Sequence, residues 1–299
     1  MPRGEKPQHG SLLQWSRRSF LLGLGAASLV SMPSLAAPPL TAPVRFGLTP
    51  VFLDSDTDLL AALERYLETR LSRPVSLVKR RSYQEITTML LTGQLDAAWI
   101  CGFPYIQFRS QLGLVAVPVY RKQPLYQSYV IVQNSDLAVT IDDLRGQVHA
   151  FSDPDSNSGF LVTRYLLATM NESPASFFRR SFFTYGHRNV VRAVASGLAQ
   201  SGSVDGYVWD VMAEIEPDLV GRTRVCHRSV QLGFPPIACQ ASKLGTPLVR
   251  ELRAALVDMQ TDTVGQSVLH QLRLDGFAVG EPSLFDGIAA MSDFVRAPA

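Results

Sequence analysis

The chain has 299 residues, with 28 basic and 26 acidic side chains and a formal net charge of +2. Four of the basic residues and one acidic residue lie in the first 36 positions, which leaves 24 basic and 25 acidic residues in the remainder. This balance argues against a nucleic-acid partner, because such partners are bound through an excess of positive charge. About 260 residues beyond position 36 suffice for one large domain or two lobes.

The first 36 residues predict an export signal. Arg17 and Arg18 precede a weakly apolar run, and Ser34-Leu35-Ala36 offers the small residues that a signal peptidase needs. Paired arginines before a core diluted by Gly and Ser favour a twin-arginine signal. The alternatives are a cytoplasmic amphipathic helix or a membrane anchor, and an anchor needs roughly 20 strongly apolar residues. We therefore expect residues 1–36 to be removed and the mature protein to lie in the periplasm.

Short apolar runs alternate with helical patterns from residue 44 onward. This alternation predicts a mostly parallel sheet with both faces covered. Strands are expected at 44–49, 75–79, 97–101 and 114–120, and helices at 56–71 and 83–91.

The same pattern restarts after Pro124. Residues 229–236 contain Gly and two Pro residues, which indicates that the chain crosses back. The expected fold is α/β with two lobes, one inserted into the other, and two mixed, mostly parallel sheets joined by a two-strand hinge. Residues 44–125 plus 234–299 would form lobe 1, and 126–233 lobe 2. The later strands are expected at 128–132, 147–152, 181–184, 204–209 and 223–228, and the helices at 158–170, 189–196, 248–259 and 264–272.

The stretch FSDPDSNSGFLVTRYLL, residues 151–167, is the most informative part of the chain. A predicted strand ends at Ser152, and Ser156, Asn157 and Ser158 lead into a predicted helix. Exposed N–H groups at a helix start, with hydroxyls beside them, can hold an anion. Gly159 would let that anion approach the backbone. The alternative is an ordinary helix cap, since Ser and Asn are preferred there.

Several further motifs occur in a fixed order around this stretch. Together they resemble the phosphonate-binding periplasmic proteins over roughly residues 44–245. The resemblance implies a type II periplasmic-binding-protein fold and a monomer that delivers a small anionic ligand to an ABC permease. It implies no enzymatic activity, no cofactor and no metal site. The motifs are Tyr83 before a helix, Gly93 to Trp99, Leu144-Arg145-Gly146, Gly186-His187, Ala193 to Gly197, and Val204-Asp205.

The resemblance also implies binding roles for individual residues. Ser156, Asn157 and Ser158 would cradle an oxyanion. The remaining roles fall to Tyr83 and Tyr126 as hydroxyl donors, His187 as an imidazole donor, and Asp210 as a polar contact. Tyr83 could instead be a core residue, and His187 and Asp210 could be helix caps.

Two departures from the family pattern bear on the ligand. Asn157 stands where the family usually has Thr, and residues 231–236 offer no acidic side chain to pair with a ligand amine. The sequence therefore favours an amine-free oxyanion such as phosphite, phosphate or methylphosphonate.

Cys101 follows a predicted strand end, where ligands of open α/β sheets bind. A thiol there suits arsenic(III), so one alternative is an arsenic-binding sensor that signals to a membrane histidine kinase. Cys101 could also be simply a small buried residue of the core. Cys101, His187 and Asp205 could form a nucleophile, a base and an orienting acid, but His187 is expected in the other lobe. Cys226 and Cys239 are also expected in different lobes, so we expect three free thiols.

The export signal is testable by replacing Arg17 and Arg18 with Lys. The twin-arginine route requires the arginine pair, so the variant should remain in the cytoplasm with its leader uncleaved. Fractionation and intact-mass measurement would show this. Normal periplasmic accumulation of the Lys-Lys variant would refute the assignment.

Overall fold

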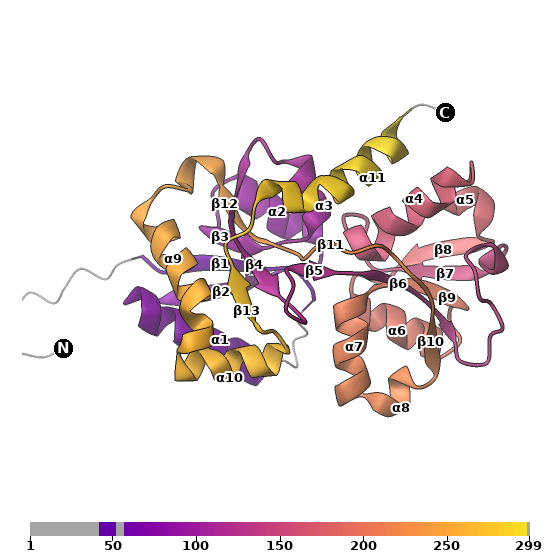
Figure 1. The fold of residues 1–299 in the computed structure, drawn as a ribbon, viewed down its shortest axis with the longest axis horizontal. Coiled ribbons are helices and arrows are strands. Elements are labelled where there is room, and N and C mark those ends of the chain that lie inside the picture. The colour runs from indigo at the N-terminus through magenta and orange to yellow at the C-terminus, as the bar shows by residue number, and fades with distance from the viewer. Residues whose placement is uncertain (1–41, 52–56, 298–299) are drawn as a thin grey trace, which may run out of the picture. The chain divides into compact units, whose positions relative to one another are not determined.

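The structure is a computed structural model and describes residues 42–51 and 57–297. The expected leader at 1–36 and the expected helix start at Asp56 lie outside these residues. Within them the chain forms a two-lobed α/β fold (Figure 1), as the sequence predicts. In the described ranges, no helix is both long enough and apolar enough to cross a membrane.

The first lobe is built on a six-stranded sheet with the order β13-β4-β12-β3-β1-β2. Strand β1 pairs in parallel with β2 and β3, whereas β12 and β13 join antiparallel. The strands are β1 (Val44–Leu48), β2 (Val75–Lys79), β3 (Ala97–Trp99), β4 (Leu112–Val119), β12 (Ile237–Gln240) and β13 (Gly276–Ala278). The α-helices are α1 (Thr57–Leu71), α2 (Tyr83–Leu91), α3 (Gly102–Gln107), α9 (Pro247–Val257), α10 (Thr263–Leu272) and α11 (Asp286–Arg296).

The second lobe is built on a five-stranded sheet with the order β10-β6-β9-β7-β8. Here β7 pairs in parallel with β8 and β9, and β6 pairs antiparallel with β9 and β10. The strands are β6 (Ser128–Gln133), β7 (Val148–Phe151), β8 (Arg180–Phe183), β9 (Ser201–Asp205) and β10 (Thr223–Arg228). The helices are a π-helical turn (Asn157–Leu161), α4 (Val162–Thr169), α5 (Pro174–Phe177), α6 (His187–Ala195), α7 (Gly206–Ile215) and α8 (Pro217–Val220).

Two short strands join the lobes. Strand β5 (Leu125–Tyr126) pairs antiparallel with β11 (Leu232–Gly233), which confirms the expected two-strand hinge. The return crossing is also tied to the first lobe, because the indole N–H of Trp99 donates to the carbonyl of Pro235 at 2.9 Å.

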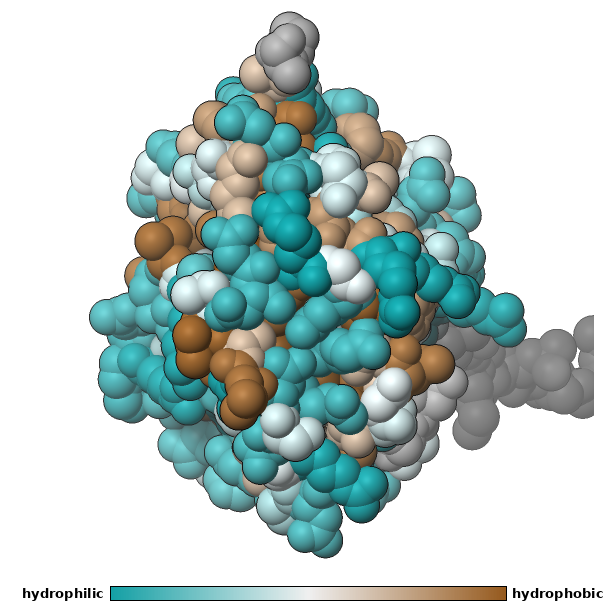
Figure 2. Space-filling view, turned by 90° about the vertical axis from the view of Figure 1, so that its right-hand side faces the viewer, coloured by the Kyte–Doolittle hydropathy of each residue, from teal (hydrophilic) through white to brown (hydrophobic). Residues whose placement is uncertain are grey.

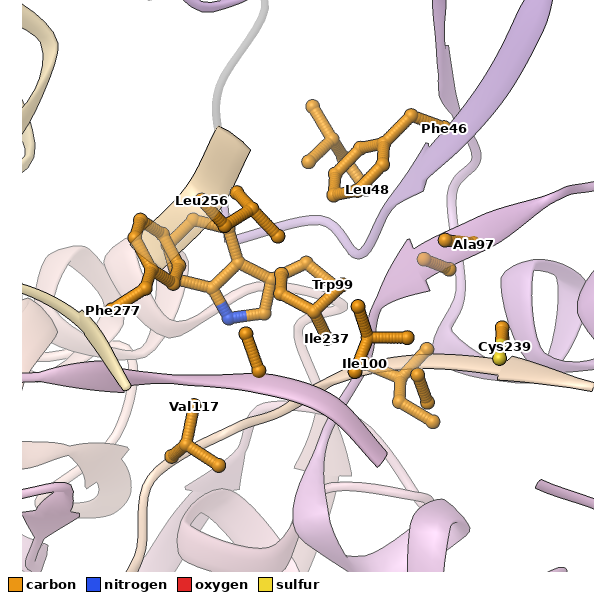
Figure 3. Packing of buried hydrophobic residues seen from close by; sticks show 14 of the residues in the cluster. Phe46, Leu48, Ala97, Trp99, Ile100, Val117, Ile237, Cys239, Leu256 and Phe277 are labelled. Carbon is orange, nitrogen blue, oxygen red and sulfur yellow. The ribbon is translucent and has the colours of Figure 1, made fainter. Parts of the chain in front are cut away.

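The first-lobe core forms where β3, β4, β12 and β13 present apolar side chains to α9. Figure 3 shows Trp99 of β3 beside Phe277 of β13, with Leu256 of α9 close by. The two rings meet edge to face, with their centroids 5.6 Å apart. Because large aromatic side chains bury much apolar area, this cluster fixes the end of β3, from which Cys101 follows.

Three sequence expectations about the fold are wrong. The strand expected at 204–209 lies at Ser201–Asp205, and the chain turns into α7 because the Asp205 carboxylate caps it, accepting the N–H groups of Tyr207 and Val208. Neither sheet is mostly parallel, since the first has two parallel and three antiparallel pairings and the second has two of each. The last element expected from the sequence is the helix at 264–272, whereas β13 and α11 follow it, and α11 packs against both α3 and α4.

The three cysteines are free thiols in the structure. Cys226 lies on β10 and Cys239 on β12, in different lobes as expected. At the end of the molecule that carries β7 and β8, the surface is mostly hydrophilic, with hydrophobic residues in small separate groups (Figure 2).

A buried histidine makes the second lobe sensitive to acid. His149 on β7 is 0% exposed, its ring nitrogens contact the hydroxyls of Ser201 and Ser203 at 2.9 and 2.8 Å, and it stacks on Phe178. Burial lowers the pKa of His149 from 6.5 to about 3. Between these values the unfolded chain binds more protons than the folded chain, so stability is present above pH 6.5 and is lost as the pH falls toward 3.

We therefore expect the melting temperature of His149→Gln to depend less on pH than that of the unmodified chain between neutral and mildly acidic pH. Thermal denaturation followed by circular dichroism would measure this. His270→Gln, at an exposed position, is the matched control and should follow the unmodified chain. Equal pH slopes for both variants would contradict the prediction.

Candidate functional site

The predicted anion loop follows β7 and begins with a wide helical turn. The N–H of Leu161 donates to the carbonyl of Ser156, and that of Val162 to Asn157, so both bonds span five residues. Such π-helical turns are rare and occur often at functional sites. The sequence predicts a single helix over 158–170; the structure instead places this turn first and α4 after it.

Gly159 has a packing role in this turn. A Cβ atom there would lie 1.8 Å from the hydroxyl oxygen of Ser152, so only glycine lets the turn approach the end of β7. The Ser156 hydroxyl caps the turn by accepting the N–H of Gly159 at 3.0 Å. The cap interpretation and the donor interpretation of Ser156 are therefore compatible, because the Ser156 hydroxyl proton is not used in this bond.

Asn157 and Ser158 contact the hinge. The Asn157 amide donates to the hydroxyl of Tyr126 at 2.8 Å, and the Ser158 side chain also hydrogen-bonds that hydroxyl. Tyr126 ends β5, and all three residues are at most 2% exposed. Burial is the main reason why the pKa of Tyr126 lies well above its usual value. Tyr126 is therefore a neutral phenol.

Cys101 is a first-lobe residue that contacts the π-helical turn. Its sulfur accepts the main-chain N–H of Asn157 at 3.1 Å and that of Phe103. Burial raises the pKa of the thiol to about 12, so Cys101 remains protonated at neutral pH. A protonated, buried sulfur is a poor nucleophile and a poor metal ligand.

Tyr83 and His187 form a second contact between the lobes. The main-chain N–H of Asp205 donates to Nδ1 of His187 at 3.0 Å, so Nδ1 carries no proton. Burial lowers the pKa of His187 to about 3, and the single proton of the neutral ring must therefore lie on Nε2. This Nε2–H donates to the Tyr83 hydroxyl oxygen at 3.0 Å, which leaves the hydroxyl proton for another acceptor.

Two buried carboxyl groups border the cluster, and sequence reasoning gave neither a binding role. Asp153 accepts the main-chain N–H of Tyr83 at 3.2 Å, where a helix N-terminus favours negative charge. Asp205 caps α7, and burial raises its pKa to about 7. Both positions could be suspected from the sequence, since Asp153 follows a predicted strand and Asp205 belongs to the Val204-Asp205 motif.

Asp210 lies apart from this cluster. Its carboxylate contacts the hydroxyls of Tyr120 and Tyr129 at 3.1 and 3.3 Å and the guanidinium of Arg121 at 3.0 Å. These groups and Tyr126 line one cavity beside the hinge with a volume of about 170 Å³. The structure thus gathers seven of the eight expected residues around the π-helical turn and places Asp210 on the hinge side. Over the described part of the chain, no group of three or more His, Cys, Asp or Glu side chains is arranged to hold a metal ion.

Comparison with known families gives a match over residues 46–285 to the model described as "ABC transporter, phosphonate, periplasmic substrate-binding protein". The chain belongs to this family. The resemblance drawn from the sequence motifs is thereby confirmed.

Individual relatives are distant. The phosphate-import protein PhnD of Mycolicibacterium smegmatis is 24% identical over 188 residues, which cover 58% of this chain and 57% of that protein. Among solved structures, a binding protein component of an ABC phosphonate transporter from Pseudomonas aeruginosa has a TM-score of 0.78 at 18% identity, covering 85% of this chain and 87% of its own. PhnD1 from Prochlorococcus marinus in complex with methylphosphonate has a TM-score of 0.75 at 16% identity, covering 84% and 97%. These structural likenesses establish the shared fold.

Thiol reactivity tests the burial of this site. Cys226 is only partly buried, whereas Cys101 and Cys239 are buried. With iodoacetamide and no reductant, we expect Cys226 to be alkylated first and the two buried thiols only after denaturation, with all three alkylated in the end. Mass spectrometry of the peptides would follow this order. A residual disulfide between Cys226 and Cys239, or rapid labelling of Cys101, would contradict the structure.

Proposed function

We propose that this chain is the periplasmic solute-binding component of an ABC importer, and that it captures a small oxyanion of the phosphonate, phosphite or phosphate type between its lobes. One observation carries the proposal: polar groups from both lobes and from the hinge meet in one buried cluster at the π-helical turn. Methylphosphonate bound to the Prochlorococcus marinus relative supports this ligand class. The proposal includes export by the twin-arginine route, a monomeric state and delivery to an ABC permease.

The proposed binding mechanism assigns a donor to each part of the fold. Ser156, Asn157 and Ser158 would hold the oxyanion on the second lobe, with the N–H groups of the π-helical turn beside them. Tyr126 would contact it from the hinge. Tyr83, whose oxygen accepts from His187, would donate its hydroxyl proton from the first lobe and so favour closure.

Asp210 would act from the hinge cavity through Tyr120, Arg121 and Tyr129. In this proposal the lobe bounds are those expected from the sequence, 44–125 plus 234–299 and 126–233. The strands of the two sheets support them, because the five-stranded sheet uses only Ser128–Arg228 strands and the six-stranded sheet uses strands before and after that segment.

Two alternatives are less well supported. A catalytic triad would need His187 beside the thiol of Cys101, but both ring nitrogens of His187 are engaged by Tyr83 and Asp205. An arsenic sensor linked to a histidine kinase would need a thiolate, whereas burial keeps the pKa of Cys101 at about 12. The family is described as a transport component, which also favours the importer.

The test is calorimetric titration of the mature protein with methylphosphonate. Ser158→Ala should weaken binding roughly 10- to 100-fold, because a charge-assisted hydrogen bond contributes about 1.5–3 kcal/mol and about 1.4 kcal/mol is tenfold. Tyr83→Phe should weaken binding less and should also reduce the ligand-induced compaction seen by solution scattering.

Cys101→Ser serves as the comparison variant, because it keeps a small polar group at the contact with Asn157. It should leave the affinity nearly unchanged if Cys101 does not hold the ligand. If Cys101→Ser abolished binding while Ser158→Ala did not, the ligand would be held by sulfur, and the arsenic-binding alternative would replace this proposal.

A further inference from the structure

The Asn157 side chain has one satisfied and one unsatisfied end. Its amide N–H donates to Tyr126, but among the described residues its carbonyl oxygen, Oδ1, has no hydrogen-bond partner although the side chain is 0% exposed. An unpaired buried acceptor is costly. An amide oxygen carries no proton, so only a donor can satisfy it.

Two carboxyl groups near Tyr83 add further acceptors to the cluster. Asp153 and Asp205 both lie near enough to Tyr83 to act electrostatically on its hydroxyl. Asp205 uses one oxygen, Oδ1, to accept both capping N–H groups of α7. The cluster therefore combines donors with the acceptors Asn157 and Asp153, whereas Asp205, whose pKa burial raises to about 7, is largely protonated at slightly acidic pH.

A ligand that can only accept hydrogen bonds does not match this combination. Its oxygens would satisfy the hydroxyls of Tyr83, Ser156 and Ser158, but it would leave Oδ1 of Asn157 unpaired. A singly charged ligand that bears a hydroxyl can satisfy both kinds of group, since that hydroxyl donates while the other oxygens accept.

We propose that Asn157 makes the site selective for tetrahedral oxyanions that carry a hydroxyl group, such as the monoanions of phosphonates, phosphite and phosphate, and that it excludes sulfonates and sulfate. The proposal rests on the oxyanion-binding function proposed above. Methylphosphonate monoanion and methanesulfonate together test the role of the ligand hydroxyl. Both are tetrahedral and bear one methyl group and one negative charge, and they differ in the hydroxyl proton.

The experiment is calorimetric titration of the mature protein with these two ligands at slightly acidic pH, where methylphosphonate keeps its hydroxyl. The unmodified protein should bind methylphosphonate at least about 100-fold more tightly than methanesulfonate, because a site that pairs with a ligand hydroxyl discriminates strongly against the analogue without it. In Asn157→Thr this ratio should fall to about tenfold or less, since a threonine hydroxyl can donate to a sulfonate oxygen.

Ser158→Ala is the matched control on the neighbouring position. It removes a donor that either ligand can use, so it should weaken both and leave their ratio within about threefold of the unmodified value. Melting curves of each variant would confirm that it is folded, and the comparison of the two ligands on the unmodified protein needs no variant.

Two results would overturn the inference and leave the proposed function standing: equal binding of both ligands by the unmodified protein, or an unchanged ratio in Asn157→Thr. Equal binding would mean that the amide turns its NH₂ group toward the ligand. Failure of the unmodified protein to bind any phosphorus oxyanion would instead overturn the proposed function and the inference with it.

Discussion

The hydrogen bond from the main chain of Asp205 to His187 fixes the direction of the polar contacts between the lobes. A main-chain N–H can only donate, so Nδ1 of His187 must accept, and the neutral ring must carry its proton on Nε2. The Tyr83 oxygen then accepts from His187, and its own proton must point to something else. A β-strand end in the second lobe thus turns a tyrosine of the first lobe into an obligate donor.

This arrangement explains how a chain with almost no net charge beyond position 36 can hold an anion. Hydroxyls, main-chain N–H groups and a helix start provide directed partial charges, and these are most effective where water is excluded. Neutral donors also let the lobes close without burying an unpaired cation, which would cost several kcal/mol. Selectivity can then come from the few acceptors among the donors, Asn157 and the two carboxyl groups.

Interactions outside the cluster also join the lobes, since α11 packs against α4 and the Tyr207 hydroxyl donates to the carbonyl of Leu272. The ion pair between Arg121 and Asp210 involves an arginine side chain that is 67% exposed, and that between Arg273 and Glu214 involves a glutamate that is 58% exposed. Exposed pairs of this kind contribute about 0–1 kcal/mol.

The sequence predicted the fold well where the spacing of apolar residues agrees with the positions of Gly and Pro. The alternation of strands and helices, the inserted second lobe and the Gly/Pro-marked return crossing are all properties of local patterns. The sequence-based prediction was wrong where one residue suits two different structures. VDGYVWD, residues 204–210, is rich in the β-branched and aromatic residues that favour a strand, but Asp205 is also a helix cap, and the cap prevails because it satisfies two N–H groups of α7.

The limits of sequence prediction at the site have a similar cause. The order of the motifs indicated that Tyr83, Tyr126, His187 and the 156–158 loop belong to one site. It could not show that Asn157 contacts Cys101 from the other lobe. Nor could it show that Ser152 requires a glycine at position 159, because that depends on the 1.8 Å that would separate a Cβ atom there from the Ser152 hydroxyl oxygen. Contacts between distant segments depend on how the lobes meet, and no local pattern records them.

The position of Tyr126 connects the 156–158 loop to the two strands that join the lobes. It is part of the hinge strand β5, which pairs with β11, and its ring lies 5.5 Å from that of Phe234, next to β11. Its hydroxyl meets Asn157 and Ser158. A change in the hydrogen bonds of the 156–158 loop therefore acts directly on a residue of the strand pair that joins the lobes. Each strand of the hinge is only two residues long. The contacts of the Tyr126 side chain with Asn157 and Phe234 can therefore influence the geometry of the hinge.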